Sequence, residues 1–221
     1  MMAQLLQREL NELKKKLLKL SAIVEEVVIL AVKSIADRDA ELAVRIIDGD
    51  IEIDHMEVDL EEDCLKLLAL YQPVAVDLRF IVAALKINND LERIGDLAVN
   101  IAERAVFLSH REKADFPFDF PAMAETVKKM VRKSLDAFVR MDEDLAHEVM
   151  VIEEGVDMLH REMYGKLESG ICRNPDQVQT YISLLGVSRN LERIADHATN
   201  IAEDVIYLIE GKIVRHAKNL D

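Results

Sequence analysis

The feature that most constrains this chain is a thirteen-residue segment that occurs twice. LERIGDLAVNIAE at 91–103 recurs one hundred positions later as LERIADHATNIAE at 191–203, and ten of the thirteen residues are identical. A long internal match at a fixed distance is typical of a structural unit that a chain contains more than once. We therefore expect the 221 residues to form two related units, each with one copy of the segment.

Both copies have the pattern of an amphipathic helix. In the first copy, four apolar residues spaced three or four positions apart share one side of the helix: Leu91, Ile94, Ala98 and Ile101. Four oxygen-bearing side chains fall within an arc of roughly 80° on nearly the opposite side: Glu92, Asp96, Asn100 and Glu103. Because the three acids of this second set repel one another, we expect that side to face water, a cation or a compensating arginine.

The remaining sequence favours an all-α fold. Leu, Ala, Glu, Lys and Ile are abundant, whereas the chain has seven glycines, four prolines and no tryptophan. The amphipathic patterns predict six helices, at 5–36, 40–70, 74–110, 122–140, 144–169 and 177–209. Pro73 and Pro175 mark turns between helices. Gly49 and Gly155 are expected to interrupt the second and fifth helices.

These helices predict two tandem, pseudo-repeated three-helix bundles, with six long antiparallel helices in all. The first bundle is expected at 1–112, a linker at 113–121 and the second bundle at 122–221. Each helix of such a bundle buries one apolar stripe at coiled-coil-like angles.

Charge and hydropathy exclude several classes of protein. The formal net charge of −14 argues against nucleic-acid binding, which requires a broad basic face. The longest apolar runs, 27–32 and 80–85, are too short to span a bilayer, and the first twenty residues do not have the pattern of a signal peptide. We therefore expect a cytoplasmic protein whose contact with a membrane is at most peripheral. Cys64 and Cys172 are expected to be buried free thiols.

A second acidic pair precedes the first turn. Asp50 and Asp54 are separated by three residues, as are Glu92 and Asp96, and the two pairs are equally far from Pro73. In antiparallel helices joined by a tight turn, residues equally distant from the turn lie at the same height. The two pairs are therefore expected side by side, roughly 30 Å from the turn at about 1.5 Å per residue.

The second half repeats this arrangement. Glu153 and Asp157 follow Asp50 and Asp54 by 103 positions, and they mirror the acids of the second repeated segment about 174–175. Oxygen ligands without thiolates suit Mg, Ca, Mn or Fe better than zinc, and spacing of four residues lets two carboxylates of one helix bridge adjacent ions. The predicted metal ligands are Asp50, Asp54, Glu92, Asp96, Glu153, Asp157, Glu192 and Asp196, with Asn100 and Asn200 one turn further along.

Two other interpretations remain open. One is a metal-independent helical scaffold whose acids form a solvated face, with the arginines of the repeated segments as counter-charges. The other is a carboxylate-bridged metal enzyme, which would use Glu-x-x-His segments. Glu52 and His55 form such a segment, and Asp157 and His160 form a partial one. The third and sixth helices lack a match, and no nucleophile motif or phosphate loop is present, so we predict no catalytic residues.

With these features the chain resembles the PhoU family of regulators of bacterial phosphate uptake and signalling. The resemblance covers nearly the whole length and rests on the repeated segments, on QPVAVDLRFIVAALKINNDLERI at 72–94, and on the acidic pairs. It implies multinuclear clusters of iron or another hard metal on the surface of a dimer-prone cytoplasmic protein. It also implies negative regulation of the phosphate-starvation response, through contact with the ATPase subunit of the phosphate-specific ABC transporter and with its sensor histidine kinase.

Overall fold

The computed structural model describes residues 2–114 and 118–211, which form an all-α fold. Its elements are α1 (Met2–Asp37), α2 (Ala40–Tyr71), α3 (Ala75–Ser109), α4 (Phe120–Arg140), α5 (Glu143–Arg173), the short 3-10 helix η1 (Pro175–Gln177) and α6 (Val178–Glu210). The predicted fold class is confirmed, with three long helices in each half of the chain.

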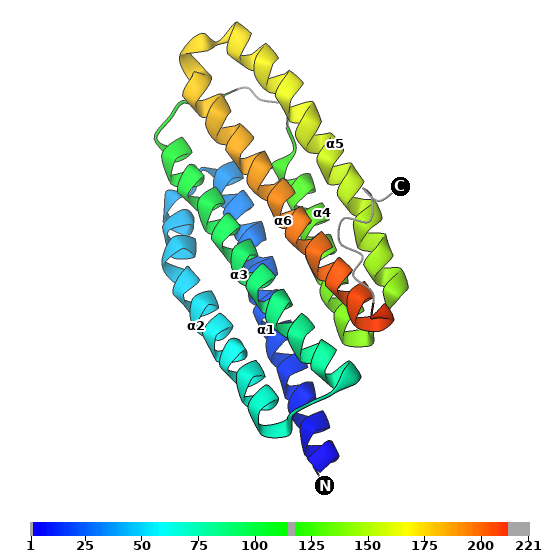
Figure 1. Cartoon of the computed structure of the whole chain (residues 1–221). Coiled ribbons are helices and arrows are strands. Elements are labelled where there is room, and N and C mark those ends of the chain that lie inside the picture. Colours follow the sequence, from blue (N-terminus) through cyan, green and yellow to red (C-terminus); the bar gives the residue numbers. More distant parts are fainter. Residues whose placement is uncertain (1, 115–117, 212–221) are drawn as a thin grey trace.

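The two halves lie side by side as elongated bundles (Figure 1). α2 packs against α1 and α3, α5 packs against α4 and α6, and the halves meet where α3 contacts α6 and α1 contacts α4. Helices α2 and α5 therefore occupy the two outer edges. The buried hydrophobic side chains of both halves form one continuous cluster, so the bundles share a core surface along their contact.

Polar pairs join α3 to α6 and show that the two helices run antiparallel. Lys86 Nζ of α3 lies 3.0 Å from the buried carboxylate of Asp204 on α6. Further along, Asp90 Oδ1 lies 2.8 Å from His197 Nδ1. From the first pair to the second, the residue numbers increase along α3 and decrease along α6. The two copies of the repeated segment are therefore related by an approximate two-fold arrangement.

Aspartates begin three of the helices. Asp39, Asp119 and Asp142 occupy the N-cap positions of α2, α4 and α5, and each carboxylate accepts a hydrogen bond from the backbone N–H three residues on, at 2.8, 2.9 and 3.1 Å respectively. These caps satisfy backbone donors that have no partner within the helix. Before the turn at Pro73, the backbone of Gln72 is left-handed (φ 45°), and its N–H donates to the carbonyl of Leu68 at 3.2 Å.

Two predicted interruptions are wrong, because α2 and α5 continue through Gly49 and Gly155. A glycine inside a helix costs about 1 kcal/mol relative to alanine, which is less than a buried aliphatic side chain contributes. In α2, Ile46 and Ile53 are buried on either side of Gly49, so core packing maintains the helix.

Helix α4 begins earlier than predicted, inside the segment expected to be a linker. α4 starts at Phe120, within 113–121, because Asp119 caps it and Pro121 suits its first turn. Residues 115–117 of this segment and residues 212–221 of the predicted second bundle lie outside the described part of the chain, so the domain boundaries stay a prediction.

The thiols are not both buried. Cys64 is buried, but Cys172, near the end of α5, is exposed, so that part of the prediction is wrong. Gly170, two residues earlier, is buried against Tyr181 of α6, and two positions correspond to roughly 200° around a helix, so Cys172 lies on the opposite side of α5.

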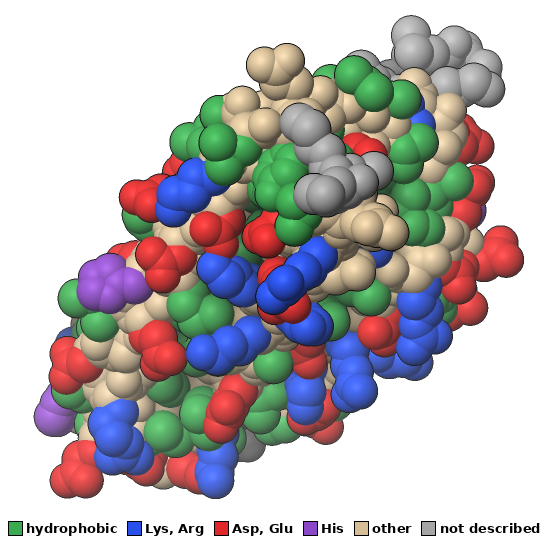
Figure 2. Space-filling view, turned by 90° about the horizontal axis from the view of Figure 1, so that it is seen from below, with side chains coloured by type: hydrophobic (Ala, Val, Ile, Leu, Met, Phe, Trp, Pro, Cys, Tyr) green, Lys and Arg blue, Asp and Glu red, His purple; other side chains and the backbone are tan. Residues whose placement is uncertain are grey.

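No helix within the described residues is both long and apolar enough to cross a bilayer. Figure 2 shows the end of the molecule where α2 turns into α3, with acidic, basic and hydrophobic side chains interspersed over that face.

Candidate functional site

The first acidic patch lies between α2 and α3, the two antiparallel helices that the turn at Pro73 connects. The charge of Asp50 interacts with those of Asp54, on its own helix, and Asp96, on α3. The charge of Glu92 interacts in turn with those of Asp96 and Asp54. The structure therefore places these four carboxylates together at one height of the helix pair, which we call the first acidic patch.

Gly95 allows the two helices to approach closely at this patch. A Cβ atom at Gly95 would lie 3.1 Å from Ile53 Cδ1 and 3.5 Å from Asp50 Oδ1. The first of these contacts is tighter than ordinary van der Waals packing, so a side chain here would push α2 outward. In the second half the equivalent position is Ala195, so the two helix pairs do not need the same separation.

The carboxylates of this patch are short of compensating charge. Burial, followed by the charges of Asp54 and Asp96, raises the pKa of Asp50 to about 6. The pKa of Glu92 is also raised, first by burial and then by Asp96. Arg93 is the local counter-charge, with Nη1 2.9 Å from Asp96 Oδ2 and Nε 3.3 Å from Glu92 Oε2. Even so, Glu92 Oε2 is buried and accepts no hydrogen bond from the described residues.

Glu57 extends the patch and was missed by the sequence analysis. Its pKa is raised by burial first, then by the charges of Glu61 and Asp54. Its backbone carbonyl accepts a hydrogen bond from Asn88 Nδ2 at 2.8 Å. The signal was available, because Glu57 is three positions from Asp54 and lies almost opposite Asn88 when the chain is reflected about the turn.

The two predicted asparagines lie one turn beyond the acids. Asn100 is exposed, and its amide nitrogen donates to the backbone carbonyl of Asp96 at 2.9 Å. Asn200 is half-buried on α6. The amide group of Asn100 is thus held beside the first patch by its own helix.

The second acidic patch joins α5 to α6. The charges of Asp157, Glu192 and Asp196 interact, and the pKa values of Glu192 and Asp196 are raised, first by burial and then by neighbouring carboxylates. Arg161 Nη2 lies 3.2 Å from Asp157 Oδ2. Glu153 is half-buried one turn before Asp157 on α5. The three mutually interacting acids define the second patch.

An imidazole distinguishes the second patch from the first. His160 occupies the position equivalent to Glu57, and Ser188 the position equivalent to Asn88. His160 Nδ1 and Ser188 Oγ are 2.9 Å apart and hydrogen-bonded. Burial lowers the pKa of His160, against the opposing effect of Asp157. The second patch therefore has a ring nitrogen where the first has a carboxylate.

The donor set of the first patch fits a hard cation in its chemistry. All of its side-chain donors are oxygens, and burial together with mutual repulsion leaves negative charge that a cation would relieve. In the described part of the chain, however, no three His, Cys, Asp or Glu side chains converge as they would around one bound ion. Metal binding by the ten predicted ligands stays a prediction.

The residues expected of a carboxylate-bridged enzyme do not face the core. Glu52 and His55 are both exposed on α2, whereas such enzymes bind their metals between helices inside the bundle. His160 is engaged by Ser188 near the second patch. Thus the two Glu-x-x-His-like segments do not meet around a common centre.

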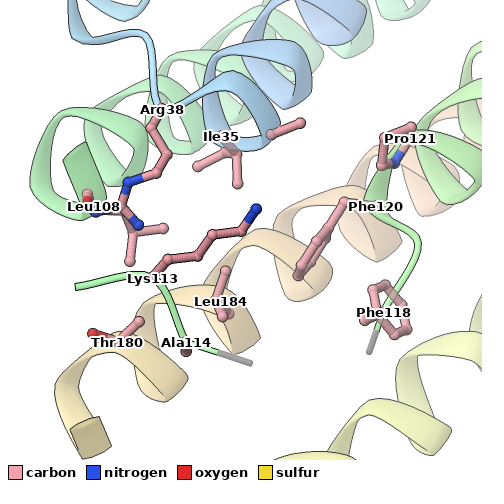
Figure 3. Close-up of a pocket in the computed structure, with 11 residues that line it drawn as sticks. Ile35, Arg38, Leu108, Lys113, Ala114, Phe118, Phe120, Pro121, Thr180 and Leu184 are labelled. Atoms are coloured by element: carbon pink, nitrogen blue, oxygen red, sulfur yellow. Dashed lines mark hydrogen bonds between the residues drawn. The ribbon is translucent and has the colours of Figure 1, made fainter. Parts of the chain in front are cut away.

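A pocket of about 290 Å³ lies at the opposite end of the bundles from the turn at Pro73, between the ends of α1 and α3 and the start of α4 (Figure 3). Arg38 points into this region, but its guanidinium donates to the backbone carbonyls of Leu108 and Arg111. Figure 3 shows the Lys113 side chain extended across the pocket, with Phe120 on the far wall. Arg38 is therefore occupied in closing the end of α3, and we assign the pocket no ligand.

Comparison with known proteins gives matches over almost the entire chain. The family model described as "PhoU domain" matches twice, at residues 17–105 and 120–205. A relative from Aquifex aeolicus (strain VF5), named "Phosphate-specific transport system accessory protein PhoU homolog", is 41% identical over 209 residues, which are 95% of each chain. A relative of the same name from Clostridium acetobutylicum is 35% identical and covers 97% of this chain and 98% of its own.

Solved structures agree with these matches. The crystal structure of PhoU from Pseudomonas aeruginosa superposes with a TM-score of 0.87 at 36% identity, covering 93% of this chain and 99% of that one. The phosphate transport system regulatory protein PhoU from Streptococcus pneumoniae gives a TM-score of 0.84 at 30% identity, covering 95% and 99%.

Proposed function

Because this chain belongs to the PhoU family, we propose that it is an accessory protein of a phosphate transport system and a negative regulator of the phosphate-starvation response. The observation that supports this most is the likeness over nearly the whole length, in both halves, to relatives named for that system. The same likeness makes a regulatory role more favourable than a catalytic one.

In this proposal the protein acts in the cytoplasm by binding other proteins. Its partners are the ATPase subunit of a phosphate-specific ABC transporter and the sensor histidine kinase of the response, and it forms homodimers. The two acidic patches lie at the outer helix pairs of the molecule, α2–α3 and α5–α6, where their partly exposed carboxylates are accessible to a partner. Their excess negative charge favours basic partner surfaces.

We further propose that both patches bind a hard metal ion such as iron, manganese or magnesium. The carboxylates of Asp50, Asp54, Glu92 and Asp96 would hold it in the first half, and Asp157, Glu192 and Asp196, together with Glu153, in the second. The ion would neutralise the patch and bring the carboxylates together. Raised pKa values support this role, because a cation adds most stability where carboxylates repel one another.

The regulatory proposal is tested by deleting the gene and measuring a phosphate-starvation reporter, such as alkaline phosphatase activity, in phosphate-rich medium. We expect the reporter to be active in the deletion strain and repressed again when the intact gene is restored. Co-purification with the transporter ATPase subunit and the kinase of the same organism should accompany repression. A reporter that stays repressed in the deletion strain would refute the proposal.

The contribution of the first patch is tested by Glu92→Gln with Asp96→Asn. Glu52→Gln with Asp59→Asn is a matched control, because both residues are exposed acids of α2 and the change in charge is the same. Elemental analysis of purified protein measures the metal, and the reporter measures regulation. Loss of metal with regulation intact would separate the two roles, whereas equal metal content in both variants and wild type would exclude the patch as a site.

A further inference from the structure

A second feature of α2 is a line of four exposed apolar residues. They recur every seven positions and are 45%, 60%, 50% and 53% exposed in chain order: Val44, Ile51, Val58 and Leu65. We call them the heptad stripe. Single exposed apolar residues are common on protein surfaces, but a regular series along one helix is not. At about 1.5 Å per residue the stripe extends roughly 31 Å.

The stripe is separate from the face that α2 buries. The core face of this helix carries residues two positions after each stripe residue: Ile46, Ile53, Leu60 and Leu67. At 100° per residue, two positions correspond to roughly 200°, so the stripe lies on the side away from the core. Since α2 packs against α1 and α3 at one edge of the molecule, that side is left uncovered (Figure 1).

The second half of the chain serves as an internal comparison. The positions of α5 equivalent to the heptad stripe, 103 residues later, are polar or charged and exposed: His147, Glu154, Arg161 and Glu168. α5 does expose Val151 and Met158, which are seven residues apart, but the next position in that series is Gly165. Packing of the bundle therefore does not require apolar residues at the stripe positions.

Negative charge borders the stripe along its length. On a helix the neighbours of a residue are three and four positions away. The charged residues in these positions around the stripe are five acids, Glu41, Asp48, Asp54, Glu61 and Glu62, all of them exposed, and His55 is the remaining titratable neighbour. These positions contain neither Lys nor Arg. One border has Glu41, Asp48, His55 and Glu62, the last paired with Lys66 at 3.0 Å, and the other has Asp54 and Glu61 at its centre, between apolar residues. A surface that is apolar along its centre and bordered by these acids suits a partner with basic borders.

We propose that the heptad stripe of α2 binds an amphipathic α-helix of another protein, with apolar residues at heptad spacing and Lys or Arg beside them. A seven-residue repeat on a straight helix drifts by about 20° around the helix axis per repeat, so the stripe runs at a slant along α2, as suits a second helix that crosses at a small angle. The apolar residues of the partner would pack between Val44, Ile51, Val58 and Leu65, and its basic residues would meet the acidic borders. This binding goes beyond the proposed regulation, because it requires neither metal nor phosphate.

Charge argues against two other occupants. A second copy of α2 would place acidic borders against acidic borders, where like charges in close contact are unfavourable. An anionic membrane surface would repel the same residues, whereas helices that bind membranes have basic polar faces. A basic amphipathic helix satisfies both the spacing and the charge.

The test uses the full-length protein and a fluorescently labelled synthetic helix with leucine at heptad spacing and lysine at the bordering positions. Fluorescence anisotropy measures its binding near physiological salt. The stripe variant is Ile51→Glu with Val58→Arg, which introduces the residues found at the equivalent positions of α5. The matched control is Val151→Glu with Met158→Arg, which makes the same replacements at exposed residues of α5. Circular dichroism verifies that both variants are folded.

We expect the wild type and the α5 control to bind the lysine-bordered helix equally, and the stripe variant to bind at least tenfold more weakly. A helix of the same composition in scrambled order, or one bordered by glutamate, should also bind at least tenfold more weakly than the lysine-bordered helix. Equal binding by the stripe variant and the wild type would overturn the proposal. So would equal binding of the scrambled helix, which would indicate charge attraction alone, or self-association through the stripe in sedimentation experiments.

Discussion

Replacement of Asp50 by asparagine tests the electrostatic description of the first acidic patch directly. In the absence of metal, the Asp50 carboxylate is half-buried beside Asp54 and Asp96, and its pKa is raised from 3.8 to about 6. Asparagine keeps the shape of the side chain and removes its charge. We therefore expect Asp50→Asn to stabilise the metal-free protein at neutral pH.

The magnitude and its pH dependence follow from the raised pKa. A pKa that is higher in the folded state means that the folded protein binds more protons between about pH 4 and 6, so stability is lost as the pH rises through that interval. A difference of about two pK units corresponds to about 3 kcal/mol at most. Because Asp50 is partly exposed, solvent screening reduces this to about 1 kcal/mol, or a rise in Tm of about 2–4 °C for a chain of this size.

The measurement is urea unfolding followed by circular dichroism, with EDTA present, from pH 4.5 to 8. The advantage of Asp50→Asn over the wild type should be greatest above pH 7 and should shrink toward pH 4.5. Asp48→Asn is the control, because Asp48 is exposed and its replacement should change stability by less than about 0.5 kcal/mol. A hard metal ion added without EDTA should raise the stability of the wild type more than that of Asp50→Asn.

Two results would refute this reasoning. If Asp50→Asn is no more stable than the wild type at pH 8 in EDTA, the carboxylate is not strained by its neighbours. If its advantage is the same at every pH, the effect arises from packing and not from ionisation.

Three further predictions concern the helices and the thiols. Gly49→Ala should raise the free energy of unfolding by about 0.5–1 kcal/mol in urea titrations, because Gly49 is exposed inside α2 and a Cβ there would meet nothing within 4 Å; a loss of stability would contradict the continuous helix. Gly170→Ala should lower the free energy of unfolding by about 1–3 kcal/mol, because the alanine Cβ would lie 2.8 Å from the buried ring of Tyr181. Unchanged stability would show that the ring can move. A thiol reagent at pH 8 should modify the exposed Cys172 quickly and leave Cys64 unmodified in the folded protein, because burial raises the pKa of Cys64 to about 12. Mass spectrometry of the digested protein identifies the modified cysteines, and rapid modification of both would disagree with the structure.

Much of the fold can be predicted from the internal repeat and from the residues that mark the turns. Apolar spacing identified six helices, and their ends agree with the structure to within a few residues except where α5 runs on to Arg173. The turn at Pro73 fixes which residues of α2 and α3 lie at the same height. Because register about a turn can be counted along the chain, the sequence was enough to predict that Asp50 and Asp96 lie close together.

Other features depend on contacts that no local pattern reports. His160 joins the second patch because Ser188 of α6 lies across from it, and Cys172 is exposed because it lies on the side of α5 away from α6. Whether Gly49 breaks α2 depends on how strongly the flanking residues are buried.

The sequence by itself determined the helices, their order and the duplication, because these follow from periodicity and short-range stereochemistry within each half. Only the tertiary structure decided how α3 packs on α6, which pairs Asp90 with His197, and which side of α2 remains uncovered. Those outcomes depend on how two bundles approach each other. Residues more than one hundred positions apart then share one environment, and their charges and burial are set by neighbours that the linear order does not place beside them.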